Sequence, residues 1–266
     1  MKKTYSFLEN ISLPETFIHI SQHLFSLDNT VVTAWNDLSN DVLHCYRIDA
    51  FERLQALLKW MYQYQGFSQA SESYFSMSSY HLEHVLASKM GHSTTLAILC
   101  KSLAEQLDLK VELLLLPSDV MLSFYQEKTK EYHYFSALNG EPLSEHALLC
   151  FIRAEEGNLL LPSMDSYFEP ATDEALIRRL LSEIKAVAHN EKAYEISFEI
   201  CNILIAWRGR HTSLVRERAM LAQLLGCVDF ASAEFMNLIE EEPDDPLIDF
   251  VKFKLHEMEF EHNVFH

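Results

Sequence analysis

Apolar residues recur at helical spacing over the first part of the chain. Around residues 50–61 they follow the i, i+3, i+4 pattern of a single helix face. These positions are Phe51, Leu54, Leu57, Leu58 and Met61. Gly66 follows the pattern and is a typical helix end, because glycine adopts the left-handed conformation without a steric penalty. We therefore expect two or three helices between residue 13 and about residue 65, and a loop in the serine-rich stretch 67–79.

A second pattern, a glycine followed by a helix and a buried strand, begins at Gly91. Ser93 is a preferred N-cap residue, and the helix after it carries a continuous apolar stripe. The stripe comprises Leu96, Leu99, Cys100, Leu103 and Leu107. The run KVELLLLP at 110–117 predicts a strand that is buried on both faces and closed by its proline. The segments VMLSFYQ and EYHYFSAL flank the charged turn EKTK and predict an antiparallel hairpin.

From about residue 172 onward the strand signals end and helix follows helix. We expect a helix-rich α+β domain over residues 1–170 and an all-α domain over residues 171–266. The segment 212–246 resembles one tetratricopeptide unit, which needs small or aromatic residues at fixed points of two helices and a final proline. The matching positions are Ala219, Gly226, Ala231, Phe235 and Pro243.

The composition excludes several classes of protein. The chain has 266 residues and a formal net charge of −18, whereas nucleic-acid binding needs clustered lysine and arginine. Six glycines are too few to favour a glycine-rich nucleotide loop, and we expect no cofactor. No run approaches the ~18 apolar residues of a membrane span, and the first residues lack the apolar region of a signal peptide. We therefore expect a cytoplasmic protein that binds neither nucleic acid nor membranes.

Metal sites are not expected either. The five cysteines contain no C-x-x-C pair, which suits neither a disulfide framework nor a structural zinc site. His81, Glu83, His84 and His92 cluster in sequence, but their spacing matches no zinc signature, and thirteen histidines make chance pairs common. The acidic run LIEEEPDDPLID at 238–249 lacks the glycine and the alternating ligands of a calcium loop.

The order of these elements resembles the SirB-type family of bacterial proteins, in which a transglutaminase-like domain precedes tetratricopeptide repeats. The similarity covers about residues 15–260. Residues 89–96, KMGHSTTL, stand where members carry a stretch like R-R-G-I-P-I-S-L. Residues 117–121, PSDVM, replace a stretch like P-G-H-F-L, and residues 136–141, SALNGE, replace one like D-P-F-N-G-G. The run VRERAML at 215–221 stands where members commonly have an R-D-R-G-like run.

The resemblance implies where catalytic residues would stand. Active transglutaminase-fold enzymes use a cysteine at the helix start, a histidine on the next strand and an aspartate on the strand after. At those positions this chain has Ser93, Asp119 and Ser136. The thiol chemistry needs all three groups, because an imidazolium lowers the pKa of the thiol and the aspartate orients the imidazole. A serine without a base is not a nucleophile at neutral pH, so the resemblance implies a degenerate site with no catalytic residue.

Neighbouring residues do not obviously replace the lost groups. His92 is adjacent to Ser93, but adjacent residues at a helix start point apart. His133 alternates with tyrosines along a strand and is interpreted as a surface or cross-strand residue. Cys100 lies about two turns past Ser93 on the apolar stripe, and we expect a buried packing cysteine.

We therefore expect a non-catalytic protein-interaction or regulatory protein with an unidentified protein partner. Stacked helix pairs present a groove that suits an extended or helical peptide, and the degenerate pocket between Ser93, Asp119 and Ser136 is a candidate ligand site. One alternative is a hydrolase or peptide-modifying enzyme with a remade site around Ser93, which requires a base within about 3 Å of the hydroxyl. Another is a regulatory partner of a basic protein, whose binding would weaken with salt because exposed charges are screened.

Overall fold

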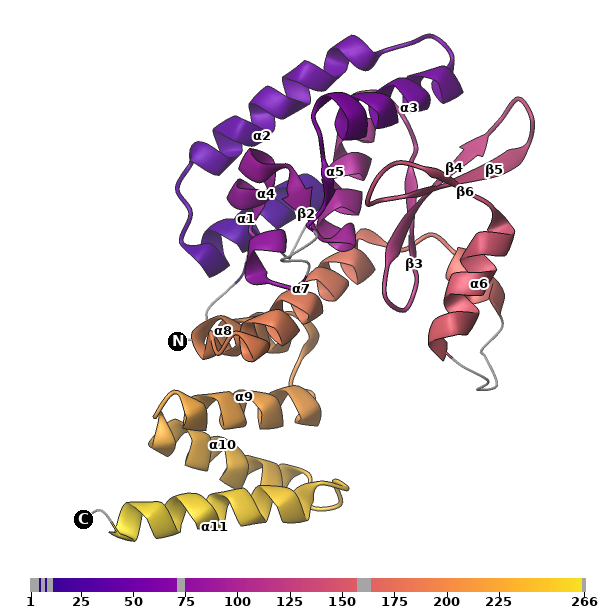
Figure 1. Cartoon of the computed structure of the whole chain (residues 1–266). Coiled ribbons are helices and arrows are strands. Elements are labelled where there is room, and N and C mark those ends of the chain that lie inside the picture. Colours follow the sequence, from indigo (N-terminus) through magenta and orange to yellow (C-terminus); the bar gives the residue numbers. More distant parts are fainter. Residues whose placement is uncertain (1–4, 6–7, 9–11, 71–74, 157–163, 265–266) are drawn as a thin grey trace. The chain divides into compact units, whose positions relative to one another are not determined.

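The computed structural model describes residues 5, 8, 12–70, 75–156 and 164–264. Its internal contacts divide the chain into two units, Ile11–Leu180 and Met1–Asn10 together with Leu181–His266. The division falls inside helix α7 (Asp173–Asn190), which therefore contributes to both units (Figure 1). The expected domain boundary at residue 170 stays a prediction.

The larger unit begins with helices, as expected from the periodicity. They are α1 (Leu13–Phe25), α2 (Thr30–Asp41), α3 (Ala50–Leu58) and α4 (Leu82–Ser88), with a short 3-10 helix at Val42–Cys45. Helix α3 continues as a π-helical segment over Lys59–Tyr64, and its apolar face is buried. Gly66 follows with a φ of 78°, which confirms the predicted helix end.

The serine-rich segment holds more structure than the expected loop. Ser68–Gln69 (β1) pairs in parallel with Met90–Gly91 (β2), and Met77–Ser79 forms a short 3-10 helix. Helix α4 ends at Ser88, with Lys89 in the left-handed conformation. The expectation was wrong because the two short strands are distant in sequence, and a local pattern carries no information about their pairing.

A four-stranded antiparallel sheet in the order β3-β4-β5-β6 completes the larger unit, and the predicted hairpin is confirmed. Its strands are β3 (Glu112–Leu115), β4 (Val120–Gln126), β5 (Glu131–Ser136) and β6 (Pro142–Leu143). Leu114 and Met121 lie on the face that packs against Leu148 and Ile152 of helix α6 (Glu145–Glu156). Side chains of the other face, including His133, contact Phe51 of α3. Helix-rich α+β, the expected fold class, is confirmed.

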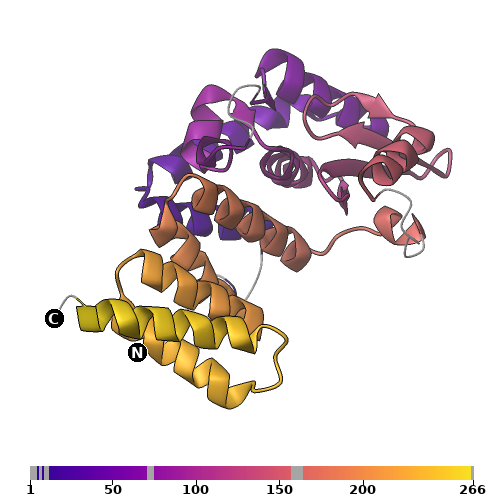
Figure 2. The same cartoon turned by 60° about the horizontal axis from the view of Figure 1, so that its bottom comes forward.

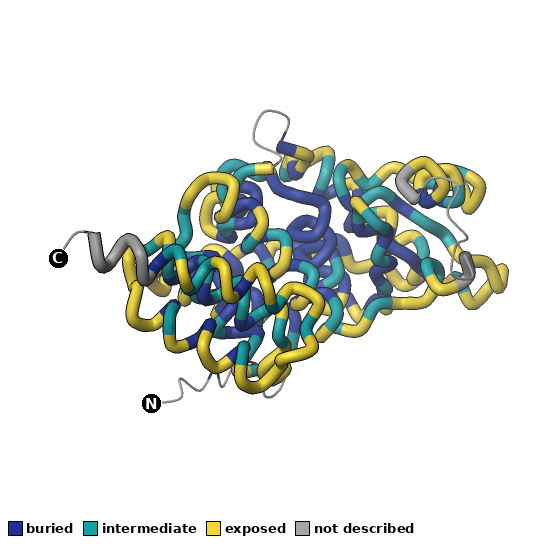
Figure 3. The backbone as a smooth tube through the Cα atoms, turned by 90° about the horizontal axis from the view of Figure 1, so that it is seen from below, coloured by how far each residue is buried: buried dark blue, intermediate teal, exposed yellow. Residues whose placement is uncertain are grey.

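The smaller unit is helical throughout the residues that the structure describes. After α7 come α8 (Tyr194–Arg208), α9 (Thr212–Leu224), α10 (Val228–Glu241) and α11 (Ile248–Val264). These four helices stack in chain order (Figure 1), and Figure 2 shows them, orange to yellow, from a second direction. Buried positions alternate with exposed ones along the chain (Figure 3). The core of these helices contains Val215, Ala219, Ala222, Ala231, Phe235, Leu238, Val251 and Met258. Each helix thus has one buried face, as amphipathic helices in a repeat structure require.

The predicted repeat positions occupy distinct places in these helices. Ala219, Ala231 and Phe235 have no exposed surface and lie in the shared core of α9, α10 and α11. Gly226 lies between α9 and α10 with a φ of 76°, a conformation that glycine adopts at no steric cost. Pro243 lies in the exposed turn between α10 and α11.

Charged residues of the VRERAML run connect neighbouring helices. Arg216 pairs with Asp245 at 3.0 Å, and Glu217 pairs with Lys185 of α7. The guanidinium of Arg218 pairs with Glu234 of α10, and its Nη1 donates to the side chain of Asn202 in α8 at 3.1 Å. The run, which lies in α9, is therefore linked by side-chain contacts to α7, α8 and α10.

Candidate functional site

Helix α5 (Ser93–Gln106) begins one residue earlier than expected. His92, and not Ser93, is its N-cap, and His92 Nδ1 accepts a hydrogen bond from the backbone N–H of Thr94 at 3.4 Å. An imidazole nitrogen can accept this bond as an asparagine oxygen does, although histidine is not among the preferred caps. Capping preferences alone therefore could not predict His92 as the N-cap. Ser93 is the first residue of the helix.

Gly91 allows the chain to pass close to the helix that it precedes. A Cβ atom at this position would lie 3.1 Å from Leu96 and 3.2 Å from Val85. Those distances are shorter than ordinary van der Waals contact, so a side chain at residue 91 would push α4 and α5 apart. The glycine of the sequence pattern is therefore explained by packing.

His92 is buried and uncharged at neutral pH. Its side chain stacks on Tyr80 with ring centroids 4.8 Å apart, and only 3% of the residue is exposed. Burial lowers the pKa of His92 to about 4; the carboxylate of Asp119 opposes this shift, and the Arg179 guanidinium reinforces it. Asp119 and Arg179 thus lie close enough to influence the residue that precedes Ser93.

The Ser93 side chain is fully buried, and its hydroxyl has no hydrogen-bond partner among the residues that the structure describes. Thr94 and Thr95, the next two residues, are also buried, and their hydroxyls have no hydrogen-bond partner among the described residues. A buried hydroxyl without a partner loses its hydrogen bonds to water and forms none in the protein, which lowers the stability of the fold. The first turn of α5 therefore contains polar groups that the fold does not satisfy through its described side chains and backbone.

Asp119 and Ser136 lie at the two chain ends of the β4–β5 hairpin pair, one before β4 and the other at the end of β5. Asp119 lies in the turn just before β4, where its carbonyl accepts from Leu116 N at 2.9 Å. Ser136 ends β5, and its Oγ accepts from Leu138 N at 3.2 Å. Ser136 is directly opposite Met121 and therefore shares the sheet face that packs against α6. The structure thus turns Ser136 toward α6, and the pocket expected between the three residues stays a prediction.

The remaining candidate residues, Cys100, His133 and His81, are buried in the core or form local hydrogen bonds. Cys100 is fully buried, which raises the pKa of its thiol to about 12, and its neighbour is Tyr62. His133 Nε2 lies 2.8 Å from Gln126 Oε1 across the hairpin. His81 caps α4 by accepting from His84 N at 3.2 Å. Within the described part of the chain, no three His, Cys, Asp or Glu side chains gather in a group that could hold a metal ion.

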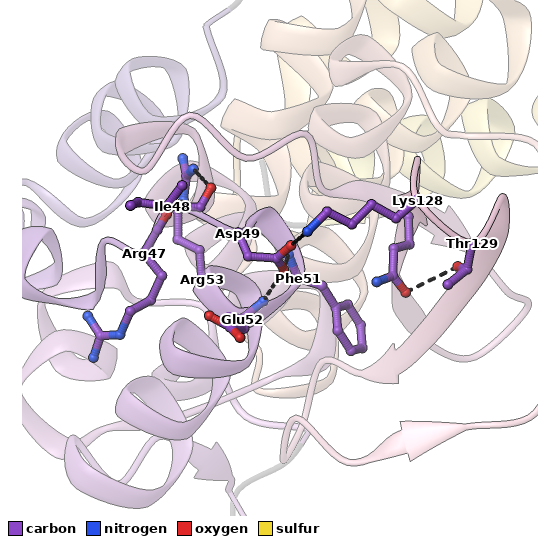
Figure 4. Close-up of polar contacts among 9 residues, drawn as sticks. Arg47, Ile48, Asp49, Phe51, Glu52, Arg53, Lys128 and Thr129 are labelled. Atoms are coloured by element: carbon purple, nitrogen blue, oxygen red, sulfur yellow. Dashed lines mark hydrogen bonds and ion pairs between the residues drawn. The ribbon is translucent and has the colours of Figure 1, made fainter.

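Two clefts lie elsewhere in the larger unit, and neither is lined by Ser93, Asp119 or Ser136. One, of about 580 Å³, lies between the start of α3, the α5–β3 connection and the β4–β5 hairpin. Asp49 caps α3 by accepting from Phe51 N and Glu52 N at 3.0 Å. It also pairs with Lys128 of the hairpin (Figure 4). The second, of about 690 Å³, lies between α3 with its π-helical extension and strands β5 and β6.

The sequence patterns did not predict the role of Arg53 in α3, which lines neither cleft. Arg53 of α3 is buried and donates to the backbone oxygens of Arg47 and Ile48 and to that of Leu107 at the end of α5. Its guanidinium also lies 4.1 Å from the ring centre of Tyr46. Arginine on the apolar side of a helix pattern is the signal that could have identified it, because buried guanidinium groups require several acceptors.

No helix of the described residues is long and apolar enough to cross a membrane. The model of the transglutaminase-like superfamily matches residues 21–182, and the model of the tetratricopeptide repeat matches residues 184–256. No solved structure matches the chain.

Several bacterial proteins are similar over most of their length. UPF0162 protein YchA of Escherichia coli (strain K12) is 26% identical over 219 residues, 81% of this chain and 79% of that protein. Protein SirB1 of Salmonella typhimurium is 24% identical over the same shares of the two chains. A UPF0162 protein of Buchnera aphidicola subsp. Baizongia pistaciae is 24% identical over 79% of this chain and 77% of its own. The chain belongs to the transglutaminase-like superfamily and, within it, to the SirB-type UPF0162 proteins, with tetratricopeptide helices after the first domain.

Proposed function

We propose that this protein is a non-catalytic interaction or regulatory protein built on a transglutaminase-like domain. The observation that carries the proposal is the state of Ser93, which is fully buried and has no hydrogen-bond partner among the described residues. A serine nucleophile needs a base within hydrogen-bond reach of its hydroxyl. The resemblance assigns Ser93 to the position of the nucleophilic cysteine in active enzymes of this fold, and no described residue supplies such a base.

The surroundings of Ser93 support the same proposal. The Nδ1 atom of His92 is already used to cap α5, so this nitrogen cannot also take a proton from a nucleophile. Ser136, at the aspartate position of the triad, uses its hydroxyl as the acceptor of a local turn. A serine there cannot stabilise an imidazolium as a carboxylate does.

The second half of the chain supports the interaction role. Residues 184–256 match the tetratricopeptide repeat, and stacked helix pairs of this kind offer long surfaces for protein segments. The formal net charge of −18 favours a basic protein as the partner, and it disfavours nucleic acid and anionic membrane surfaces.

One observation favours the second candidate, a hydrolase or peptide-modifying enzyme with a remade site. The carboxylate of Asp119 favours the protonated form of the His92 imidazole and so raises its pKa against the effect of burial. His92 immediately precedes Ser93. A carboxylate, an imidazole and a hydroxyl are the three groups of a serine hydrolase. This candidate requires the Ser93 side chain to rotate toward the imidazole and to become accessible to substrate.

The two candidates are separated by activity assays on the native full-length chain. We expect neither hydrolysis of activated esters nor transfer of amines to glutamine peptides above the uncatalysed rate. Ser93→Ala tests whether any activity depends on this hydroxyl, and Ser102→Ala is the matched control, since Ser102 is also buried and unpaired but lies farther along α5. Hydrolysis lost in Ser93→Ala and kept in Ser102→Ala would overturn the proposal.

The interaction role has its own test. The tagged native protein is purified from extracts of its own cell at low and moderate salt, and co-eluting proteins are identified. We expect one protein in a fixed ratio that survives moderate salt. Retention of no protein at either salt concentration would contradict the interaction role.

A further inference from the structure

Helix α11 has apolar residues on two sides. One side, with Ile248, Val251, Leu255 and Met258, packs into the core that it shares with α9 and α10. Phe250 and Phe253 on the other side expose 38% and 61% of their surface, and Leu247, immediately before the helix, exposes 48%. We call these three residues the α11 stripe. In the described structure all three remain exposed to this degree.

The stripe is continuous along the helix. Leu247 stands immediately before α11, and the three residues follow one another at intervals of three, so their side chains lie on neighbouring positions of one side. The stripe also borders the packed side of the helix, because Leu247 and Ile248 are adjacent to Val251. Three adjacent exposed apolar side chains, two of them phenylalanine, are typical of a binding surface, whereas single exposed ones are ordinary.

The turn that leads into the stripe is strongly acidic. Glu240 at the end of α10 and Glu242 and Asp244 in the turn are exposed, and none of them forms an ion pair with a described residue. Asp249 is 95% exposed and reaches only Lys252, at 3.7 Å. Glu241 and Asp245 pair with Arg210 and Arg216, but the charges of Glu240, Glu242 and Asp244 are available to a binding partner. Asp244 precedes Leu247 of the stripe by three residues along the chain.

We propose that the α11 stripe and the acidic turn bind an amphipathic helix of a partner protein, with an apolar side bordered by lysine or arginine. The apolar side covers Phe250 and Phe253, and the basic border faces Glu240, Glu242 and Asp244. A second copy of this chain is disfavoured as the occupant, because it would bring the same carboxylates against this turn. The proposal rests on the interaction role and specifies its surface and the chemistry of the partner.

The test uses the full-length protein and designed helical peptides of about 18 residues, long enough to form a helix on binding. The basic peptide has leucine on one side and lysine on its borders; in the acidic peptide, glutamate replaces lysine. We expect the basic peptide to bind more than tenfold tighter than the acidic one, measured by fluorescence anisotropy.

The variant Phe253→Asp distinguishes binding to the α11 stripe from attraction by the net charge of the protein. It removes apolar surface and adds a negative charge, so binding through net charge alone predicts equal or tighter binding of the basic peptide. The proposal predicts at least tenfold weaker binding. Ile48→Asp is the matched control: Ile48 is 97% exposed but lies in the other unit, and its replacement leaves the affinity unchanged.

A double variant, Glu242→Gln with Asp244→Asn, tests the acidic turn. We expect it to weaken the basic peptide severalfold and to flatten the salt dependence of binding. Equal affinity of native and Phe253→Asp proteins, or equal affinity for the two peptides, would overturn the proposal. A cellular partner that the native and Phe253→Asp proteins retain equally would overturn this surface and leave the interaction role intact.

Discussion

Arg218 of α9 and Glu234 of α10 form an ion pair in which the guanidinium Nε donates to a carboxylate oxygen at 3.1 Å. Both side chains are largely buried, at 12% and 9% exposure. Since the same guanidinium also reaches Asn202 of α8, one side chain joins three consecutive helices. The pair is thus a structural element of the repeat region.

Removal of this guanidinium should destabilise the smaller unit. Arg218→Ala leaves the Glu234 carboxylate buried without its main partner, which costs about 3 kcal/mol of unfolding free energy in comparable pairs. Urea denaturation followed by circular dichroism measures the change. Lys252→Ala is the control, because Lys252 is exposed and its pair with Asp249 contributes little. A similar loss of unfolding free energy in the two variants would show that the Arg218–Glu234 pair contributes no more than an exposed ion pair.

His92 should make the stability of the larger unit depend on pH. A histidine in the unfolded chain has a pKa of about 6.5, whereas burial lowers the pKa of His92 to about 4. Between these values the unfolded chain binds a proton that the folded chain does not, so the stabilisation is complete above about pH 6.5 and is lost as the pH falls toward 4. The loss amounts to about 3 kcal/mol, since one pKa unit corresponds to about 1.4 kcal/mol.

The measurement compares native protein with His92→Asn over this pH range. Asparagine keeps a helix-capping side chain and does not titrate. The variant starts with a different stability, but its unfolding free energy should fall less between about pH 6.5 and pH 4. Parallel curves for the two proteins would mean that His92 is protonated in the folded state.

Two serines that the family resemblance assigns to triad positions should respond to alanine in opposite ways. Ser93 has a buried hydroxyl with no described partner, so Ser93→Ala removes a desolvated group and should leave the unfolding free energy unchanged or raise it by up to about 1 kcal/mol. Ser136 accepts from Leu138 N, and Ser136→Ala should lower it by about 1 kcal/mol. Thermal and urea unfolding measure both. A clear loss in Ser93→Ala would indicate that its hydroxyl is bonded.

Thiol labelling should divide the five cysteines into two groups. Cys150 and Cys227 are exposed, whereas Cys45, Cys100 and Cys201 are buried. Burial raises the pKa of all three buried thiols, to about 12 for Cys100 and Cys201. Since the thiolate is the reactive form, a disulfide reagent should label two thiols rapidly in the folded protein and five after denaturation. Rapid labelling of Cys100 in native protein would reopen a nucleophilic role for it.

Local patterns determined the elements near the site. The apolar spacing after Ser93, the charged turn between two apolar runs and the glycine at residue 66 each specify a structure that depends on a few neighbouring residues. The helix, the hairpin and the helix end were therefore predictable from sequence, as was the all-helical second half. The order of these elements also sufficed for the family.

Tertiary structure decided what surrounds Ser93 and which surfaces remain free. Asp119 and Arg179 approach His92 from distant parts of the chain, and strand register turns Ser136 toward α6. Neither the burial of a hydroxyl nor a face of the sheet can be read from local spacing, because both depend on which long-range partners cover them. The α11 stripe follows the same principle: its helix is evident in the sequence, but only packing shows which of its two apolar sides stays exposed.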